Sequence, residues 1–394
     1  MQNKTFNHNR RHFLRSSLAG LAGLSVASLV SANKVINDNL TVLSENFVPP
    51  TPQKLLELHY NENAIGMSPK AKSAAIEALN TGNRYRFTEA EPLRALIAQS
   101  HNVKEENILF SAGSSDAIRI AIAAHATPGT QFVVPELTYG DGEDFAKAYN
   151  LKIAKIKSNP QDWSIDLKGM QEAVAKYQGP SIVYLVNPNN PTSTIIKSNE
   201  IETWINSKPK DTLFILDEAY AEYVNSPDYR SVDYLIAQGA DNVVLLKTFS
   251  KIHAMAGMRV GYTVAVADKI KQLQDHVELD SLTLSNPSIQ AATASIQDKD
   301  FLAYSKKSND SAREIYLNTL QELNIEYLPS ETNFVFHKIK GDIEAFRQRM
   351  LEENIKVGRP FPPANDWCRV SVGTTDEMIY VSNKLREFRQ KGWL

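Results

Sequence analysis

The feature that most constrains the fold is an alternation of short apolar segments and helix-like segments that begins near residue 107. The expected strands lie at residues 108–111, 131–134, 151–156, 181–186, 213–216, 243–246 and 260–266, and the expected helices between them at 115–125, 144–149, 167–177 and 200–206. Runs such as SIVYLV at Ser181–Val186 are almost entirely apolar, as strands buried on both faces require. The pattern predicts an α/β fold with a mainly parallel, helix-covered sheet in a large domain at 80–285.

The C-terminal third has a different pattern, with expected helices at 311–323 and 341–353 and strands at 333–337 and 368–372. This pattern predicts a smaller α+β domain. We expect residues 286–394 to form it together with residues 49–79. A dinucleotide-binding fold has little support, because no G-x-G-x-x-G segment follows an expected strand.

The N-terminus resembles a bacterial twin-arginine export signal. Arg10 and Arg11 precede an apolar, uncharged run at 18–30, which is too short to span a bilayer comfortably. Small residues at 30–32 offer a cleavage position. We expect a signal peptide at 1–32, a linker at 33–48 and a periplasmic mature protein. An uncleaved membrane anchor or a cytoplasmic protein is the alternative.

Charge and cysteine content narrow the function classes. The net charge of -2 does not favour nucleic acid or an acidic membrane surface as a partner. Cys368 is the one cysteine of the sequence, so the chain can form neither an internal disulfide nor a cysteine-rich metal site. We therefore expect no metal centre and a small-molecule substrate.

Chemically useful residues follow five of the expected strands, at the ends where ligands bind in open α/β sheets. In chain order they are Ser114 and Ser115 in a small-residue turn, Tyr139, Asn190, Asp217, and Lys251. Each has an ordinary explanation: a helix N-cap, a core tyrosine, a plain turn, a partnered carboxylate or a solvated basic loop. Their joint position along one sheet edge favours a single binding site.

These segments, in this order and spacing, resemble those of fold-type I pyridoxal-phosphate enzymes and, within them, histidinol-phosphate aminotransferases. The resemblance covers about residues 55–380. It is carried by residues 61–63 (NEN), 83–85 (NRY), 111–116 (SAGSSD), 187–192 (NPNNPT), 217–220 (DEAY), 248–251 (TFSK), 256–259 (AGMR) and 369–374 (RVSVGT).

The resemblance implies pyridoxal 5'-phosphate as cofactor. It implies that Lys251 forms a Schiff base with the cofactor and shuttles the substrate's proton, with its pKa lowered by Arg259 and the cofactor. Asp217 would keep the pyridine nitrogen protonated. Asn190 and Tyr220 would bond the ring's phenolic oxygen, and Tyr139 would stack on the ring.

The same resemblance implies a phosphate site made of Ser114, Ser115, Ser250 and Arg259. Tyr85 would reach the phosphate of a neighbouring subunit's cofactor, which implies a homodimer with shared sites. Arg369 would bind the substrate's α-carboxylate; the alternative is an ordinary surface arginine.

The chain departs from the family pattern beside the substrate. Residues 61–66 read NENAIG where the family often has NENPYG, and Ser193 replaces a usual glycine. Asn63 and Arg359 are the further substrate candidates, with Arg359 expected to meet a phosphate or carboxylate on the substrate side chain. These departures leave histidinol phosphate unsupported as the substrate.

The expected activity is transfer of an amino group from an amino acid or amine to a 2-oxo acid by a ping-pong mechanism. A decarboxylase or lyase that uses the same cofactor and fold is the alternative. A non-catalytic cofactor-binding protein is disfavoured, because binding alone would not require the lysine at 251.

Overall fold

The computed structural model describes residues 42–277 and 280–394, and the compact unit that it contains runs from Phe47 to Leu394. The expected signal peptide and most of the expected linker lie outside the described residues. Within the described residues, no helix is both long and apolar enough to cross a membrane, and no group of three or more His, Cys, Asp or Glu side chains is arranged to hold a metal ion.

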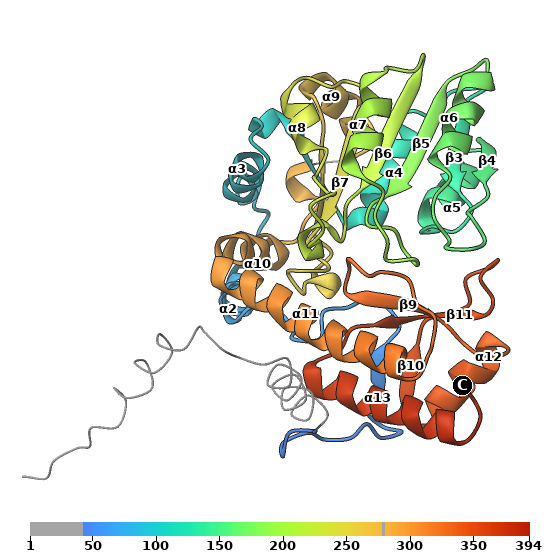
Figure 1. Ribbon diagram of the computed structural model, residues 1–394. Coiled ribbons are helices and arrows are strands. Elements are labelled where there is room, and N and C mark those ends of the chain that lie inside the picture. The colour runs from blue at the N-terminus through green and yellow to red at the C-terminus, as the bar shows by residue number, and fades with distance from the viewer. Residues whose placement is uncertain (1–41, 278–279) are drawn as a thin grey trace, which may run out of the picture. The chain divides into compact units, whose positions relative to one another are not determined.

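The largest sheet in the described residues has seven strands in the order β2-β8-β7-β6-β5-β3-β4 (Figure 1). The strands are β2 (Ile108–Ser111), β3 (Gln131–Pro135), β4 (Lys152–Ile156), β5 (Ser181–Val186), β6 (Thr212–Asp217), β7 (Val243–Thr248) and β8 (Gly261–Val264). β8 runs antiparallel to both of its neighbours, and the remaining pairs are parallel. The expected α/β class with a mainly parallel sheet is confirmed.

Burial on both faces explains why the central strands are apolar. Every residue of β5, β6 and β7 is buried. Alternate residues of β5 enter two different cores: Val183 joins one cluster and Tyr184 the other. One core is covered by α4 (Ser114–Ala123), α5 (Asp141–Ala148) and α9 (Ala267–Gln274), and the other by helices that include α6 (Leu167–Lys176), α7 (Ser198–Asn206) and α8 (Asp233–Ala237).

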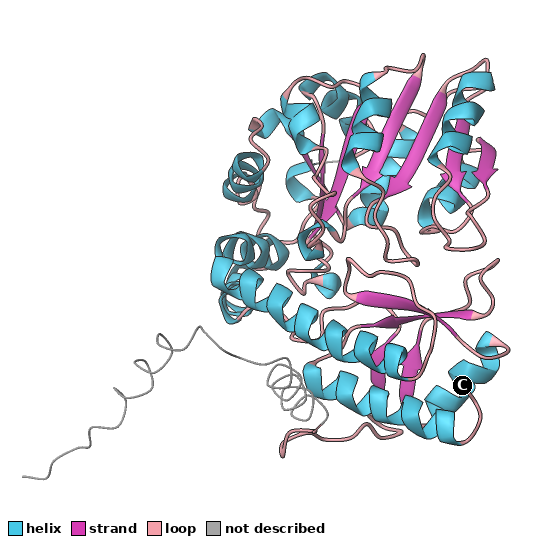
Figure 2. Ribbon diagram, viewed as in Figure 1, coloured by secondary structure: helices cyan, strands magenta, loops and turns pink. Residues whose placement is uncertain are grey.

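The second part of the unit contains two small sheets, apart from the large one (Figure 2). Residues far apart in the sequence pair in them. β1 (Leu56–Leu58) pairs in parallel with β10 (Ile355–Val357), and β9 (Phe334–Lys338) pairs antiparallel with β11 (Trp367–Ser371). Three helices lie beside these strands: α11 (Lys299–Glu322), α12 (Ile343–Glu352) and α13 (Thr375–Gln390). β1 therefore brings the start of the compact unit beside its C-terminal strands.

Several helices lie where the sequence analysis named none. α2 (Pro69–Ala78) packs against α10 (Asn286–Gln297), and both contribute to the same core as α3 (Glu91–Ser100) and the large sheet. α11 begins at Lys299, well before the expected start at 311. The sequence analysis missed this first part of the helix because residues 299–310 are mostly polar and show little apolar periodicity. α13 begins with a capping box between Thr374 and Glu377, a local signal that was present in the sequence.

Candidate active site

A cavity of about 550 Å³ lies at the carboxyl ends of the central strands, bordered also by β11 and the loop after β10. It brings together most of the residues that the sequence indicated. They are Ser114, Ser115, Tyr139, Asn190, Asp217, Tyr220, Ser250, Lys251, Arg259, Arg359 and Arg369. The position agrees with the rule that ligands bind beyond the carboxyl ends of parallel strands.

One end of the cavity is shaped to hold a phosphate. α4 begins at Ser114, directly after Gly113, whose φ of 87° suits glycine. The first N–H groups of a helix have no intrahelical partners, so those of α4 are available to an anion at this end of the cavity. A Cβ at Gly113 would lie 2.3 Å from Nη2 of Arg259, and a Cβ at Gly261 would lie 2.5 Å from the Gly113 carbonyl carbon. Both glycines therefore allow the guanidinium and the helix start to approach closely.

Asp217 is the last residue of β6 and is buried. Its carboxylate accepts hydrogen bonds from the Ala219 N–H (3.1 Å) and the Tyr184 hydroxyl (3.4 Å). Among the described residues no cation lies within ion-pair distance of it, and burial raises the pKa of Asp217 to about 6. A buried carboxylate that has no cation fits a protonated ring nitrogen as its partner.

Lys251 projects into the cavity, where its Nζ donates to the carbonyl oxygens of Tyr60 (3.3 Å) and Asn61 (3.2 Å). Burial lowers the pKa of Lys251 to about 8, and Arg369 is the largest charge that acts in the same direction. Arg259 lowers the pKa of Lys251 as expected, but it contributes less than burial and less than Arg369. Removal of the amine from water is the main cause.

Two asparagines orient the Tyr220 hydroxyl. It accepts hydrogen bonds from Nδ2 of Asn61 (3.1 Å) and of Asn190 (3.4 Å). Burial raises the pKa of Tyr220 to about 12, so its hydroxyl keeps its proton at neutral pH. Tyr139 lies on another wall, and its hydroxyl donates to Asp141 (2.9 Å).

Arg369 is 7% exposed and faces the cavity from β11, which excludes the surface-arginine alternative. Its Nη1 donates to Oδ1 of Asn190 (2.6 Å), and its Nη2 donates to the carbonyl oxygen of His59. Its Nε is buried and finds no hydrogen-bond partner among the described residues. Burial lowers the pKa of Arg369 to about 10, so the group remains charged at neutral pH.

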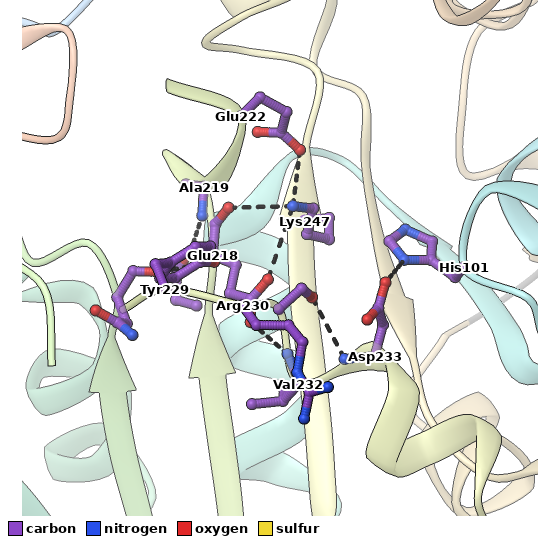
Figure 3. A network of polar contacts seen from close by, with 12 residues as sticks. His101, Glu218, Ala219, Glu222, Tyr229, Arg230, Val232, Asp233 and Lys247 are labelled. Atoms are coloured by element: carbon purple, nitrogen blue, oxygen red, sulfur yellow. Dashed lines mark hydrogen bonds and ion pairs between the residues drawn. The ribbon is translucent and has the colours of Figure 1, made fainter. Parts of the chain in front are cut away.

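A charge network around the buried Lys247 links β7 to the loop that follows β6 (Figure 3). Nζ of Lys247, on β7, lies 2.7 Å from Glu222 and 3.8 Å from Glu218, the residue that follows Asp217. Burial opposes the lysine's charge, but the two carboxylates hold its pKa above the ordinary range. Glu218 also accepts from the Val232 N–H (3.0 Å), which ties this loop to α8.

Two predicted residues lie outside the cavity lining. The Asn63 amide donates to the carbonyl oxygens of Lys251 (3.1 Å) and Ile252 (3.2 Å), so it supports the lysine's backbone and its predicted role as a substrate contact needs correction. Asn61 of the same motif faces the cavity. Tyr85 is 82% exposed, stacks with Phe87 and does not line its own chain's cavity.

The sequence analysis missed a further part of the lining, namely His59, Tyr60, Asn61, Glu62, Asp141, Asp144, Arg347 and Phe361. Asn61 and Glu62 belong to a motif that had been recognised, so a signal existed for them. Arg347 lies within α12, an amphipathic helix, where nothing in the local sequence separates a cavity arginine from a surface one.

Comparisons with known proteins agree with this geometry. The family model for aminotransferase class I and II matches residues 53–385. A crystal structure from Erwinia carotovora atroseptica, provisionally named a histidinol-phosphate aminotransferase, is 49% identical with a TM-score of 0.87, covering 88% of this chain and 100% of that one. A histidinol-phosphate aminotransferase from Staphylococcus aureus (strain bovine RF122 / ET3-1) is 32% identical over 338 residues, 85% of this chain and 91% of its own.

The fold is also shared with a histidinol-phosphate aminotransferase from Sinorhizobium meliloti solved in complex with pyridoxal-5'-phosphate. That structure is 23% identical with a TM-score of 0.78, and the match covers 88% of this chain and 96% of that chain.

Proposed function

The chain belongs to the aminotransferase class I and II family. We propose that it transfers an amino group from an amino acid or amine to a 2-oxo acid, and that Lys251, Asp217 and Arg369 in the cavity carry out this reaction. The family depends on pyridoxal 5'-phosphate. The observation that carries the proposal is the pairing, in one cavity, of a lysine with a lowered pKa and a buried carboxylate that has no cation.

The cavity residues fit that cofactor. When bound, pyridoxal 5'-phosphate supplies an aromatic ring that accepts electron density from the substrate's Cα once its proton has been removed. Asp217 would hold the ring nitrogen protonated, and Asn190 and Tyr220 would donate hydrogen bonds to the ring's oxygen. Tyr139 would lie against the ring face. The phosphate would be held by the N–H groups of residues 114–115, the Ser250 hydroxyl and the Arg259 guanidinium.

Lys251 would move the proton that the reaction requires. With a pKa of about 8, its Nζ is partly neutral near pH 7.5. It could therefore accept the proton from the substrate's Cα and deliver it to the neighbouring carbon of the bound cofactor. Arg369 would hold the α-carboxylate through its guanidinium, which is already oriented by Asn190. A ping-pong mechanism follows, because the donor's product must leave before the 2-oxo acid binds.

The visible absorbance of the holoenzyme tests this proposal. A panel of donors would include glutamate, aromatic amino acids and histidinol phosphate, the last because relatives carry that name. We expect one donor to convert the cofactor's visible band to that of its amine form, and a 2-oxo acid to restore it. Turnover that releases carbon dioxide or an elimination product without a 2-oxo acid would refute amino transfer in favour of decarboxylation or elimination.

We further propose a homodimer in which Tyr85 of one copy reaches the phosphate site of the other. The support is a group of exposed apolar side chains in one stretch of the chain: Tyr60, Ile76, Leu79, Tyr85 and Phe87. We expect light scattering to give the mass of a dimer. Y85F should weaken cofactor affinity, whereas Y149F, at another partly exposed tyrosine, should not. A monomer with full cofactor affinity would refute this proposal.

Export by the twin-arginine route is the last part of the proposal and rests on the sequence of residues 1–32 alone. We expect the protein in the periplasmic fraction of its host. An R10K/R11K variant should stay in the cytoplasm, and an unchanged distribution would refute the signal.

A further inference from the structure

We propose that Asp141 is a positioning residue for the bound cofactor: its carboxylate holds the Tyr139 ring in place and, through the Tyr139 hydroxyl, directs the hydroxyl of Ser115. The three residues line the same cavity. The inference rests on the proposed contacts of Tyr139 and of residues 114–115 with pyridoxal 5'-phosphate. It adds a residue that lies outside the motifs recognised in the sequence.

The hydrogen bonds among these three residues run in one direction. The Tyr139 hydroxyl donates to Oδ2 of Asp141 over 2.9 Å, and Oγ of Ser115 lies 3.4 Å from the same tyrosine oxygen. A carboxylate can only accept hydrogen bonds, so Tyr139 gives its single hydroxyl proton to Asp141. The Ser115 hydroxyl must then be the donor to Tyr139. A phosphate at the start of α4 is therefore left with the backbone N–H of Ser115 and not with its hydroxyl.

The tyrosine keeps its proton for this bond. Burial raises the pKa of Tyr139, and the negative charge of Asp141 adds to the effect, although the hydrogen bond with Ser115 opposes it. The bond to Asp141 therefore joins a neutral donor to a charged acceptor, a combination that gives short and strong hydrogen bonds. Because the bond is made by the far end of the side chain, it restricts rotation of the whole ring.

The alternative explanation for Asp141 is that an acidic residue in the first turn of a helix stabilises the helix dipole. α5 has three such residues: Asp141, Glu143 and Asp144. Glu143 forms ion pairs with Lys147 (2.7 Å) and Lys155 (2.6 Å). Within residues 42–277 and 280–394, no cation lies within ion-pair distance of Asp141, and the one hydrogen bond that its carboxylate accepts comes from Tyr139. The dipole alone does not explain why this carboxylate lines the cavity.

The packing of α5 fixes the position of Asp141. Asp141 is the first residue of the helix, and the next residue, Gly142, is buried. A Cβ at Gly142 would lie 2.7 Å from the Tyr184 ring and 3.2 Å from the Phe132 ring, so glycine allows the start of α5 to approach β5 and β3 closely. The Tyr184 hydroxyl also donates to Asp217 (3.4 Å). The start of α5 therefore lies near the residues proposed for both the ring face and the ring nitrogen.

A double-mutant cycle on cofactor binding tests this assignment. Wild type, D141A, Y139F and the double variant would be freed of cofactor and titrated with pyridoxal 5'-phosphate, with visible absorbance as the readout. D141A should weaken binding by about 5-fold or more, because the Tyr139 ring loses a hydrogen bond to a charged acceptor. In the Y139F background the same change should weaken binding by less than about 2-fold, since the contact is already absent.

A spectroscopic signature and two further variants complete the test. D141N keeps a neutral acceptor for the Tyr139 hydroxyl, so its affinity should lie between those of wild type and D141A. The visible circular dichroism of the bound cofactor reports how firmly its ring is held in an asymmetric site. Its intensity per bound cofactor should fall in D141A and fall less in D141N. The control is E143Q, because Glu143 lies in the same helical turn and does not line the cavity; it should change neither quantity.

Two results would overturn the assignment. One is an equal loss from D141A with and without the Tyr139 hydroxyl. Asp141 would then act through its charge, which adds to the effect of burial in raising the pKa of Asp217. The other is full affinity in both D141A and D141N.

These measurements report binding, so their failure differs from failure of the proposed function. If the cycle shows the expected coupling but no donor reacts, amino transfer fails and the assignment of Asp141 stands. If donors react and the cycle shows no coupling, the assignment of Asp141 alone fails.

Discussion

Replacing Asp217 by asparagine should stabilise the cofactor-free protein and abolish turnover. Burial raises the pKa of this carboxyl from 3.8 to about 6, which means that the folded state disfavours the charged form. At about 1.4 kcal/mol for each pKa unit, the folded protein loses roughly 3 kcal/mol when the group is ionised. Asparagine has nearly the same shape and carries no charge, so D217N should recover most of that free energy.

The sign of the pH dependence follows from the two pKa values. Above pH 6 the carboxyl is charged in both the folded and unfolded states, and the full cost of about 3 kcal/mol is present. As the pH falls from 6 toward 3.8 the folded state binds the proton first, so the cost shrinks and then disappears. D217N should therefore exceed wild type in unfolding free energy most at pH 7–8, and the gap should narrow steadily toward pH 5.

Urea denaturation of both cofactor-free proteins at several pH values would measure the gap. D144N makes the same chemical change elsewhere in the cavity and serves as the control. Adding pyridoxal 5'-phosphate should reverse the order, because only wild type can pair with the ring nitrogen. A gap that is absent at pH 8, or equal at pH 5 and pH 8, would refute the reasoning.

Three other predictions concern the groups around Asp217. R369Q should raise the pKa of Lys251 above about 8 by removing a nearby cation, and the pH dependence of its acylation in the cofactor-free protein measures this; an unchanged or lower value would contradict it. G113A should weaken cofactor affinity by about 10-fold or more, because its methyl group would meet the Arg259 guanidinium and alanine disfavours this positive φ. Absorbance titration with the cofactor measures this, and near-normal affinity would count against the phosphate site at the start of α4. K247M should lower the unfolding free energy by about 3–5 kcal/mol, because two glutamates lose their buried cation; a loss below about 1 kcal/mol in urea denaturation would rule this out.

Much of the large sheet could be read from local patterns. Strands buried on both faces are continuous apolar runs, so β5 was found with the bounds that the structure has. Helices with long polar stretches gave a weaker signal, and the first turns of α11 were missed for that reason. α10 and α3 are recognised as core elements only once their apolar residues are seen to pack with α2 and the sheet.

The sequence by itself determined which residue types follow the strands, and therefore the site of Lys251, Asp217 and Asn190. Strand direction and the rule for carboxyl ends then place those residues together. Tertiary structure decided which neighbour faces the cavity: Asn61, in a left-handed conformation (φ 55°), faces it and Asn63 does not. That choice depends on a contact with Ser371, which no local pattern encodes.

Tertiary structure also decided the electrostatics. Burial, more than Arg259, sets the pKa of Lys251, and burial cannot be read from a residue's immediate neighbours in the sequence. The same holds for Arg347, an ordinary arginine in the sequence that lines the cavity beside Arg359 and Arg369 only when α12 and the loop after β10 pack beside β11. Long-range packing brings like charges together, and the sequence cannot specify such contacts locally.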